Sequence, residues 1–218
     1  TSCYSNGTVS GNSSLGGLCG INYEGTITNC YATGDVSGEG VVGGICGRIT
    51  QGTITNSYAT GDVSGRSGLG GLCGRSSNGT ITNCYATGDV SGRSGLGGLC
   101  GYNDGGKITS CYATGSVAGE NNLGGLCGSI FNSGTIKNCY ATSDVSGGYH
   151  SECLGGLCGV NQGGIILQCY AMGSVSGDDY SEDLGGLCGW FIYGKITNCF
   201  WDRETSGMDE SEGGTGLT

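Results

Sequence analysis

The strongest constraint on this chain is a repeat of about 27 residues, in which the pattern LGGLCG…GTITNCYATGDVSG recurs through almost the whole length. A repeat of fixed period is typical of solenoids and propellers, in which each unit buries its apolar face against its neighbours. Two cysteine columns mark the period. The first column is Cys19, Cys46, Cys73, Cys100, Cys127, Cys158 and Cys188. The second column is Cys3, Cys30, Cys84, Cys111, Cys139, Cys169 and Cys199, with Ser57 in the one remaining position.

The composition of each unit favours strands over helices. Helical repeats run to about 33 residues or more, whereas these units contain short β-prone pieces such as Thr-Ile-Thr, broken by Gly or Asn. The chain has 51 Gly and no Pro, and an interior strand excludes Pro because it needs every N–H. We therefore expect an all-β fold, a right-handed parallel β-solenoid (β-helix) of about seven to eight turns of 27–31 residues, with rungs about 4.8 Å apart.

Four aliphatic columns are predicted to fill a narrow core, one residue of each column in every turn. They are Ile27, Ile54, Ile81, Ile108, Ile136, Ile166 and Ile196; Val9, Val36, Val63, Val90, Val117, Val145 and Val175; Leu15, Val42, Leu69, Leu96, Leu123, Leu154 and Leu184; and Leu18, Ile45, Leu72, Leu99, Leu126, Leu157 and Leu187. A polar column is predicted to form a hydrogen-bonded corner ladder; it is Asn29, Asn56, Asn83, Asn138 and Asn198.

These residues resemble the GLUG-motif repeat family over roughly residues 1–200. The matching stretches are Gly-Gly-Leu-Cys-Gly at 16–20 and 70–74, and Asn-Cys-Tyr-Ala-Thr-Gly-Asp-Val-Ser-Gly at 83–92. The resemblance implies β-rich repeats of large bacterial or archaeal surface and secreted proteins, adhesin-like proteins and segments attached to peptidases included, and it carries over no catalytic residue. One departure is that Cys stands in every turn where the family often has Val.

The resemblance also suggests how the chain divides. Residues 200–207 and 213–218 are similar to the segment that often follows the last such repeat. We expect GLUG-like β-solenoid repeats over residues 1–199 and an acidic, Gly-rich capping or connecting segment over residues 200–218. Because the sequence has no initiator Met and no signal-like segment, we expect it to be a mature or trimmed product.

Charge, hydropathy and cysteine content exclude several classes. The net charge of −10 argues against nucleic acid, whose phosphates need a Lys/Arg surface. No apolar run approaches the ~18–20 residues of a membrane span. Fifteen cysteines are too many for an ordinary reduced cytosolic protein, so an extracellular or cell-surface location is expected.

The cysteine columns predict disulfides, but three pairings remain open. One joins Cys19 to Cys30 and its equivalents within each turn, the next joins Cys3 to Cys19 and its equivalents, and the third joins neighbours down one column, where the rung spacing is within disulfide range. The alternative is a ladder of buried thiols that act as small hydrophobes. Cys153 lies in an insertion and is the candidate for a bond to another chain. No metal site is expected, because CxxC pairs are missing and His150 is the one histidine.

An aromatic column is predicted to stack as a ladder that stabilises the sheet, or to form a flat surface for another subunit or a glycan. It is Tyr4, Tyr31, Tyr58, Tyr85, Tyr112, Tyr140, Tyr170 and Phe200. A second array, of the Thr-x-Thr type, resembles the ice-binding face of some insect antifreeze solenoids, although Lys107, Lys137 and Lys195 interrupt it. Its early members are Thr26, Thr28, Thr53, Thr55, Thr80 and Thr82.

Acidic residues offer the one place for a cation. Asp35, Asp62, Asp89 and Asp144 stack in register, so they are either solvated or share an ion such as Ca²⁺. The acidic tail from Asp202 to Glu212 is open to the same two interpretations. Otherwise no cofactor is expected.

Insertions of three residues fall at one place in the last two full turns. They carry Tyr149, His150, Glu152 and Cys153, then Asp178, Asp179, Tyr180, Glu182 and Asp183. Insertions on one face of a solenoid often mark its contact face.

No catalytic constellation is present: no nucleophile motif and no phosphate loop accompany the single histidine. We therefore expect a non-enzymatic structural protein that self-assembles, head-to-tail or by lateral stacking, into an extracellular filament, sheath or surface layer. The alternative is a repeat stalk or adhesin module of a larger cell-surface protein, with other surface proteins or glycans as partners. Ice binding is a minor alternative.

Overall fold

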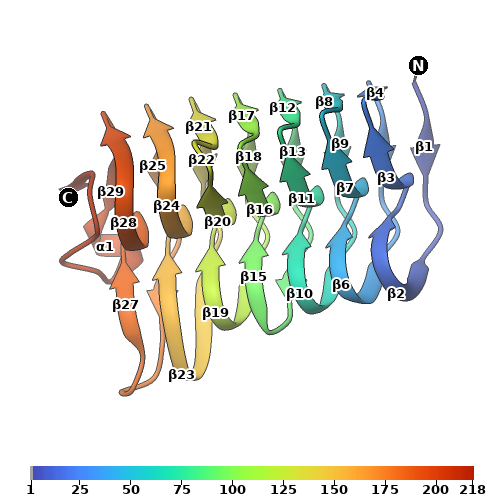
Figure 1. The fold of residues 1–218 in the computed structure, drawn as a ribbon. Helices are drawn as coiled ribbons and strands as arrows, with labels where there is room; N and C mark the ends of the chain where they lie inside the picture. Colours follow the sequence, from blue (N-terminus) through green and yellow to red (C-terminus); the bar gives the residue numbers. More distant parts are fainter. Residues whose placement is uncertain (1) are drawn as a thin grey trace.

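The computed structural model describes residues 2–218, which form a straight rod made of a parallel β-solenoid (Figure 1). The rod has about seven turns of about 27 residues, as the repeat predicts. Each turn passes through three sheets, named here sheets A, B and C, and each strand pairs in parallel with its equivalent one turn away. The predicted fold class is therefore confirmed.

Sheet A carries the Tyr-Ala pair of each turn. Its strands are β1 (Tyr4–Ser5), β5 (Tyr31–Ala32), β9 (Tyr58–Ala59), β13 (Tyr85–Ala86), β18 (Tyr112–Ala113), β22 (Tyr140–Ala141), β25 (Tyr170–Ala171), β29 (Phe200–Asp202) and β30 (Thr215–Leu217). In each turn the first strand of sheet B starts at the residue of the valine column. Its strands are β2 (Val9–Gly16), β6 (Val36–Gly43), β10 (Val63–Gly70), β14 (Val90–Ser91), β15 (Ser94–Gly97), β19 (Val117–Gly124), β23 (Val145–Gly155), β26 (Val175–Ser176) and β27 (Glu182–Gly185).

Sheet C contains the first cysteine column and the Thr-Ile-Thr segments. The strands that start at cysteine are β3 (Cys19–Tyr23), β7 (Cys46–Thr50), β11 (Cys73–Ser77), β16 (Cys100–Asp104), β20 (Cys127–Phe131), β24 (Cys158–Leu167) and β28 (Cys188–Thr197). The shorter strands are β4 (Thr26–Thr28), β8 (Thr53–Thr55), β12 (Thr80–Thr82), β17 (Lys107–Thr109) and β21 (Thr135–Lys137). In the last two turns both parts merge into the single strands β24 and β28.

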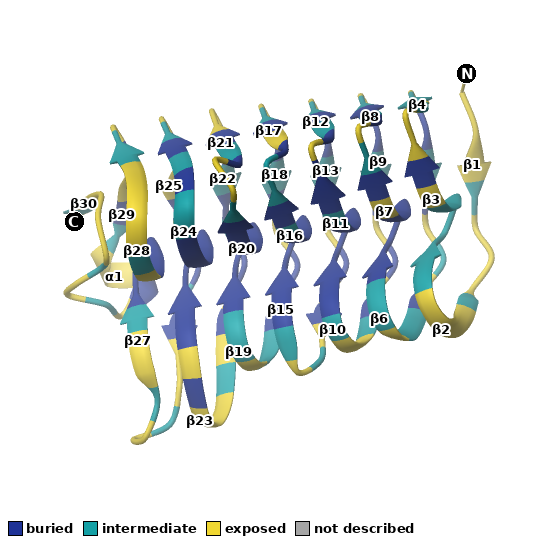
Figure 2. Cartoon of the chain, in the orientation of Figure 1, coloured by how far each residue is buried: buried dark blue, intermediate teal, exposed yellow. Residues whose placement is uncertain are grey.

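The four predicted aliphatic columns are in register and fill the interior. Ile81, for example, pairs with Ile54 and Ile108 in the neighbouring turns, and all three side chains are fully buried. The core has two parts, one built on the Ile and second Leu columns and one on the Val and first Leu columns. Burial is greatest in the middle turns and decreases toward both ends of the rod (Figure 2).

The Gly-Gly pair before the second Leu column lets the backbone pass close to the next turn. A Cβ atom added at Gly44 would lie 2.3 Å from the Gly71 carbonyl oxygen and 2.6 Å from the Ala59 Cβ. Real side chains do not approach so closely, so the recurring Gly pairs are required by the packing of adjacent turns.

Each turn changes direction at residues in the left-handed region. All five asparagines of the predicted polar column have positive φ, from 50 to 55°, a conformation that Asn tolerates better than most side chains. A hydrogen bond of 3.3 Å from Asn83 Nδ2 to Asn56 Oδ1 is part of this corner ladder. The Asn column is thus explained first by backbone conformation and second by side-chain bonding.

A further interior column, which contains both polar and apolar residues, is not predicted from the sequence. It lies three residues after the first cysteine column and consists of Asn22, Ile49, Ser76, Asn103, Ile130, Asn161 and Phe191. The buried asparagines donate to backbone carbonyls across the next corner, as Asn103 does to Gly106 at 3.2 Å and Asn22 to Gly25 at 3.1 Å. Because they satisfy backbone acceptors, these polar side chains are compatible with the core.

The C-terminal residues cover part of the last turn. Strand β29 continues sheet A, a short helix α1 (Arg203–Ser206) follows with Asp202 as N-cap, and β30 pairs with β29. The Ser211 hydroxyl accepts from the backbone N–H of Leu187 and of Cys188, at 3.0 and 2.9 Å. None of the helical structure in residues 2–218 is long and apolar enough to span a bilayer.

Candidate functional site

The first cysteine column stands at the start of the sheet C strands, in register from turn to turn. Its side chains are buried except at Cys19, which is half-buried in the first turn. Each thiol donates to the carbonyl two residues further on, from 3.0 Å for Cys19 to 3.5 Å for Cys188. The column is thus satisfied by local hydrogen bonds within each strand.

The second cysteine column precedes sheet A, and its thiols donate to the carbonyl two residues back, as Cys84 does to Thr82 at 3.1 Å. Neighbouring turns are linked as well, because the Cys84 N–H donates to the Cys111 sulfur at 3.4 Å. At the substituted position, the Ser57 hydroxyl accepts from the Cys30 N–H at 3.1 Å and donates to the Thr55 carbonyl at 2.8 Å. Serine therefore takes over both hydrogen-bonding roles of the missing thiol.

Burial and hydrogen bonds between neighbouring thiols shift the pKa of these cysteines in opposite directions along each column. Loss of hydration, with a contribution from Cys19, raises the pKa of Cys46 to about 12. Burial also raises the pKa of Cys73 and Cys158 well above the ordinary value, and the adjacent cysteines of the same column add to the shift. Hydrogen bonds from neighbouring thiols act in the opposite direction at other positions, where they lower the pKa of Cys84 and Cys100 and lower that of Cys139 to about 4. Since the thiolate is the reactive form, the thiols of one column differ in how readily they ionise.

The sulfur contacts run along each column. Cys73 interacts with Cys100, and Cys111 with Cys139, each one turn away. Of the three pairings that the sequence leaves open, the pairing of column neighbours is the one whose partners lie side by side. In this structure the cysteines are in the thiol form, and the disulfide pairing stays a prediction.

Cys153 lies at a corner of sheet B with a φ of 61°. Its side chain is 5% exposed, and its sulfur is 3.9 Å from Asp183 Oδ2. Burial and this carboxylate raise the pKa of Cys153 to about 12. A bond from Cys153 to another chain, which stays a prediction, would therefore require the insertion to open.

The tyrosine column stacks along sheet A. Consecutive rings from Tyr4 to Tyr170 have centroid separations of 4.8–5.3 Å and interplanar angles of 1–12°. Because each ring face is covered by the next ring, the surface of the column consists of ring edges and hydroxyl groups. Burial and the neighbouring phenol raise the pKa of Tyr85. This geometry matches the predicted stabilising ladder, and it offers no broad aromatic face to a ligand.

The side chains of the aspartate column accept hydrogen bonds from backbone N–H groups of the next turn. Asp35 Oδ1 accepts from the Asp62 N–H at 3.0 Å, Asp62 Oδ1 from the Asp89 N–H at 2.9 Å, and Asp144 Oδ1 from the N–H and hydroxyl of Ser174. The carboxylates thus satisfy donors at the corner between sheets A and B. Within residues 2–218 no cluster of three His, Cys, Asp or Glu side chains could hold a metal ion.

The Thr-x-Thr array lies on the outside of sheet C. Thr80 pairs with Thr53 on one side and with Lys107 on the other, so the array is regular over three turns and then interrupted. Ice binding on this surface stays a prediction.

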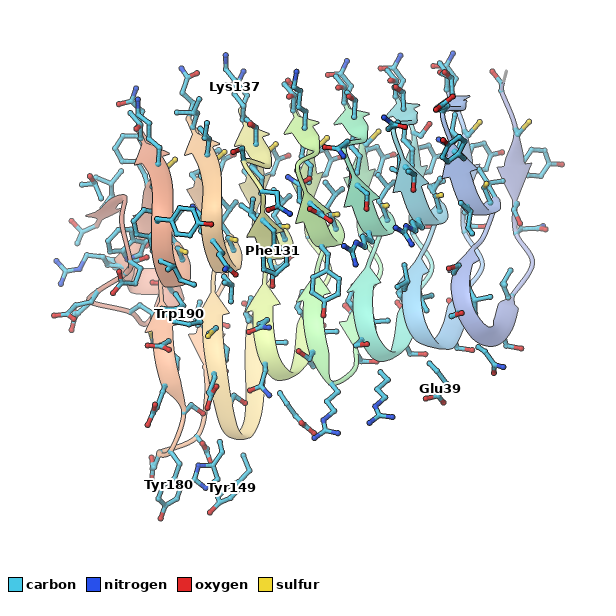
Figure 3. The ribbon with its side chains drawn as sticks, in the orientation of Figure 1. Glu39, Phe131, Lys137, Tyr149, Tyr180 and Trp190 are labelled. Carbon is cyan, nitrogen blue, oxygen red and sulfur yellow. The ribbon has the colours of Figure 1, made fainter. Side chains whose placement is uncertain are left out.

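The two insertions form a protruding tip at the edge of sheet B, where Tyr149 and Tyr180 are labelled in Figure 3. Both rings are exposed, at 70% and 59%, with centroids 5.5 Å apart. His150 packs against both, at 4.2 and 5.0 Å between centroids. Asp178 Oδ1 fixes the tip by accepting from the Ser181 hydroxyl at 2.8 Å and from the His150 N–H at 3.3 Å.

A groove on the outside of sheet C is a surface feature that the sequence does not predict. It has a volume of about 270 Å³ and is lined by Arg75, Asp104, Phe131, Asn132, Gln162 and Tyr193. The available sequence signal was that these positions change from turn to turn while the segments on either side, Leu-Gly-Gly-Leu-Cys-Gly and Gly-Thr-Ile-Thr, vary little.

Comparison with known proteins accounts for the repeat and the fold. The model of the GLUG motif matches residues 11–37, 38–64, 65–91, 92–118, 119–146 and 150–176, one turn of the rod at a time. No match was found among curated proteins. Among solved structures, the chain is similar to a crystal structure from Bacteroides ovatus, provisionally named an immunoglobulin A1 protease. The two share 25% identity with a TM-score of 0.65, over 90% of this chain and 67% of that chain.

Proposed function

Since the chain belongs to the GLUG motif family, we propose that it is a non-enzymatic extracellular structural protein, a disulfide-reinforced β-solenoid that self-assembles into a filament, sheath or surface layer. GLUG repeats occur in secreted proteins, and the high cysteine content favours an oxidising compartment. The activity in the name of the Bacteroides ovatus protein belongs to that protein, and the match leaves a third of its chain uncovered.

The observation that best supports self-assembly is the uniform tyrosine column, which runs the length of the rod with an almost constant ring spacing. This surface is straight and repeats once in every turn. The same surface of a second rod can therefore pack against it with the same contact repeated at each turn. Lateral association is favoured over head-to-tail stacking, because β30 and Ser211 cover part of the last turn. Tyrosine edges offer both apolar carbon and a hydroxyl for such a contact.

Disulfides would strengthen this assembly. Each bond restricts the unfolded chain and contributes about 2–4 kcal/mol, which matters for a rod whose core is one turn thick. Along-column bonds would tie successive turns together without changing the outer surface. Mass-spectrometric mapping of the oxidised protein should find links such as Cys73 to Cys100, whereas links within one turn, such as Cys19 to Cys30, would contradict this arrangement.

Electron microscopy of the purified oxidised protein, before and after addition of a reducing agent, tests the proposal. We expect filaments or sheets that persist in detergent and that loosen on reduction. The variant Tyr58→Ala removes one rung of the tyrosine column, and we expect it to weaken lateral association; Tyr149→Ala, at the insertion tip, is the matched control. Monodisperse monomers at high protein concentration, under oxidising conditions, would overturn the proposal.

The protruding tip favours a second candidate function, that of a stalk or adhesin module in a larger surface protein. Exposed aromatic side chains on paired insertions are suited to contact another protein. Under this alternative Tyr149→Ala, rather than Tyr58→Ala, removes adhesion of particles coated with the protein. The length of the natural chain also separates the two: a long chain with a distinct distal domain supports the stalk.

A further inference from the structure

Two segments of the repeat vary among the turns: the corner of sheet B that carries the insertions, and an outer strip of sheet C. The residues that follow the first Cys-Gly pair differ in every turn, although the segments on either side are nearly identical. The members of this strip stand two and four residues after each cysteine, except that a register shift in the last turn places Tyr193 opposite Gln162. They are Ile21 and Tyr23, Arg48 and Thr50, Arg75 and Ser77, Tyr102 and Asp104, Ser129 and Phe131, Val160 and Gln162, and Trp190 with Tyr193. Ser77, Ser129 and Val160 are buried, and the larger side chains form the surface. Solenoids use extended surfaces of stacked repeats for binding, and a strip whose side chains change from turn to turn can present a different group at each rung.

The groove of about 270 Å³ lies along this strip and crosses from β11 to β28. Five turns contribute to it, so it extends along the rod axis for about 19 Å, taken as four rung spacings of ~4.8 Å. Its polar end is held in place: Arg75 Nη2 donates to Asp104 Oδ2 at 2.7 Å, and Asn132 Nδ2 donates to Asp104 Oδ1 at 2.7 Å. These two donors hold the pKa of Asp104 below its usual range, so the carboxylate is a fixed acceptor.

The groove keeps unused hydrogen-bonding capacity. The side-chain amide of Gln162 forms no hydrogen bond with another side chain or backbone group of residues 2–218. Arg75 Nε also has no partner in the described chain, but it is buried and out of reach of a ligand. The available group is therefore the Gln162 amide, which lies in register with Tyr193 of the next turn.

Aromatic rings alternate with these polar groups. The Tyr193 ring lies over Gly163, where a Cβ atom would be 2.5 Å from the ring, and is still 58% exposed. Phe131 packs beside Tyr102 with ring centroids 6.2 Å apart and an angle of 41° between the planes. Figure 3 shows Phe131 and Trp190 on the same side of the rod, on the viewer's face of sheet C. Unlike the stacked tyrosine column, these rings are tilted or single and leave ring surface open.

We propose that this groove binds an extended, uncharged oligosaccharide that runs parallel to the rod axis, a function beyond the structural role proposed above. Sugar rings present C–H groups that pack on aromatic faces and hydroxyl groups that bond to planar polar side chains, and the groove supplies both in alternation. Each hydroxyl can donate to the Asp104 carboxylate or to the Gln162 carbonyl oxygen, and can accept from the Gln162 amide.

Size and charge support this ligand class over others. A volume of about 270 Å³ is near the lower limit for small-ligand sites. The net charge of −10 and the Asp104 carboxylate disfavour a polyanionic glycan. An uncharged oligomer fits both the length and the mixed lining.

Titration of the full chain tests the proposal, with a glycan array of neutral oligosaccharides to choose the series. The probes are β-1,4-linked oligomers of glucose and of N-acetylglucosamine from the dimer to the hexamer, and the fluorescence of Trp190, 45% exposed beside the groove, reports binding. We expect affinity to rise from the dimer to the tetramer and then to level off, because an extended tetramer already spans the groove. Phe131→Ala and Tyr193→Ala should each weaken binding of the hexamer about tenfold or more, and Gln162→Ala should weaken it by a smaller factor.

Two controls keep the outcome interpretable. Tyr23→Ala removes a comparably exposed aromatic ring, 65% exposed, from the first turn of the same strip and outside the groove; it should leave affinity unchanged, and circular dichroism should show all variants folded. A galacturonate hexamer should bind more weakly than the neutral hexamers. Absence of binding on the array and to both neutral series overturns the proposal. The proposal is also overturned if the Phe131 and Tyr193 variants change the oligomeric state but not the affinity for sugar. That result would show that the strip contacts another protein.

Discussion

At the scale of single residues, the rod is governed by backbone conformation at its corners. The corner before the first Leu column is left-handed in every turn, and its occupants are Ser14, Val41, Gly68, Gly95, Asn122, Cys153 and Asp183. Glycine adopts this conformation without penalty, whereas a β-branched side chain is disfavoured there. The variety of occupants shows that the tertiary packing of the turn imposes the conformation on whichever residue is present.

Val41 is the most strained of these residues, with a φ of 50°. We expect Val41→Gly to leave the free energy of unfolding within about 1 kcal/mol of the natural value, because removal of the left-handed penalty of about 1–2 kcal/mol offsets the loss of a half-buried side chain and the added freedom of the unfolded chain. The denaturant midpoint followed by circular dichroism measures the effect. Val42→Gly is the control: Val42 is fully buried, so this variant should lose stability. A Val41→Gly protein destabilised as much as Val42→Gly would show that the corner is not strained.

Ser57 tests whether the second cysteine column is maintained by hydrogen bonding. We expect Ser57→Cys to change stability by less than about 0.5 kcal/mol, because a thiol at this position repeats the pattern of Cys84 and Cys111. Ser57→Ala removes the acceptor of the Cys30 N–H and should cost about 1–2 kcal/mol. Thermal unfolding under reducing conditions measures both variants. If Ser57→Ala is as stable as the natural protein, packing alone maintains the column.

At the scale of elements, the two-residue strands of sheet A depend on their side chains more than on their few backbone bonds. Tyr85 stacks on Tyr58 at 4.8 Å and on Tyr112 at 4.9 Å. Since each stacked pair contributes about 0.5–1.5 kcal/mol beyond burial, we expect Tyr85→Ala to lower stability by about 1–3 kcal/mol. Tyr85→Phe keeps the ring and should be nearly neutral. Equal losses in the two variants, measured by urea denaturation, would assign the effect to the hydroxyl instead.

The corner between sheets A and B gives the rod a dependence on acid. The Ser174 hydroxyl and N–H lower the pKa of Asp144, so its ionised form contributes stability above the unfolded value of about 3.9, and this contribution is lost as the pH falls through the lower, folded value. We expect the thermal midpoint to fall below about pH 4. Asp144→Asn keeps an acceptor oxygen but does not titrate, so its midpoint should fall less steeply. Parallel curves for both proteins would contradict this role.

The sequence predicts a column correctly when the same type of residue occupies that position in every turn. The Ile, Val and Leu columns are predicted correctly because a recurring aliphatic residue in a solenoid has one place to go. The interior column that contains Asn103 and Ile130 is missed, because its members alternate between polar and apolar types and no single residue marks it. The groove is missed for a related reason: Arg75 and Asp104 occupy different offsets in different turns, and their proximity follows from the register of β11 and β16.

At the scale of the whole molecule, stability is a sum over neighbouring turns. Ile108 is fully buried between Ile81 and Ile136, whereas Ile27, half-buried, pairs with Ile54 on one side in the described chain. A cavity in the middle of the rod therefore weakens two interfaces, and the same truncation near its first turn weakens one. The turns on either side of Ile108 also lose part of their coupling to each other.

We accordingly expect Ile108→Ala to lower the free energy of unfolding by about 2–5 kcal/mol and to broaden the transition, because the two halves of the rod can then unfold separately. Ile27→Ala should cost less and should leave the main transition sharp, with loss confined to the first turn. Calorimetry measures the width and the midpoint, and hydrogen exchange locates the turns that open first. If both variants shift one equally sharp transition by the same amount, the rod unfolds as a single cooperative unit, and the nearest-neighbour description of its stability is wrong.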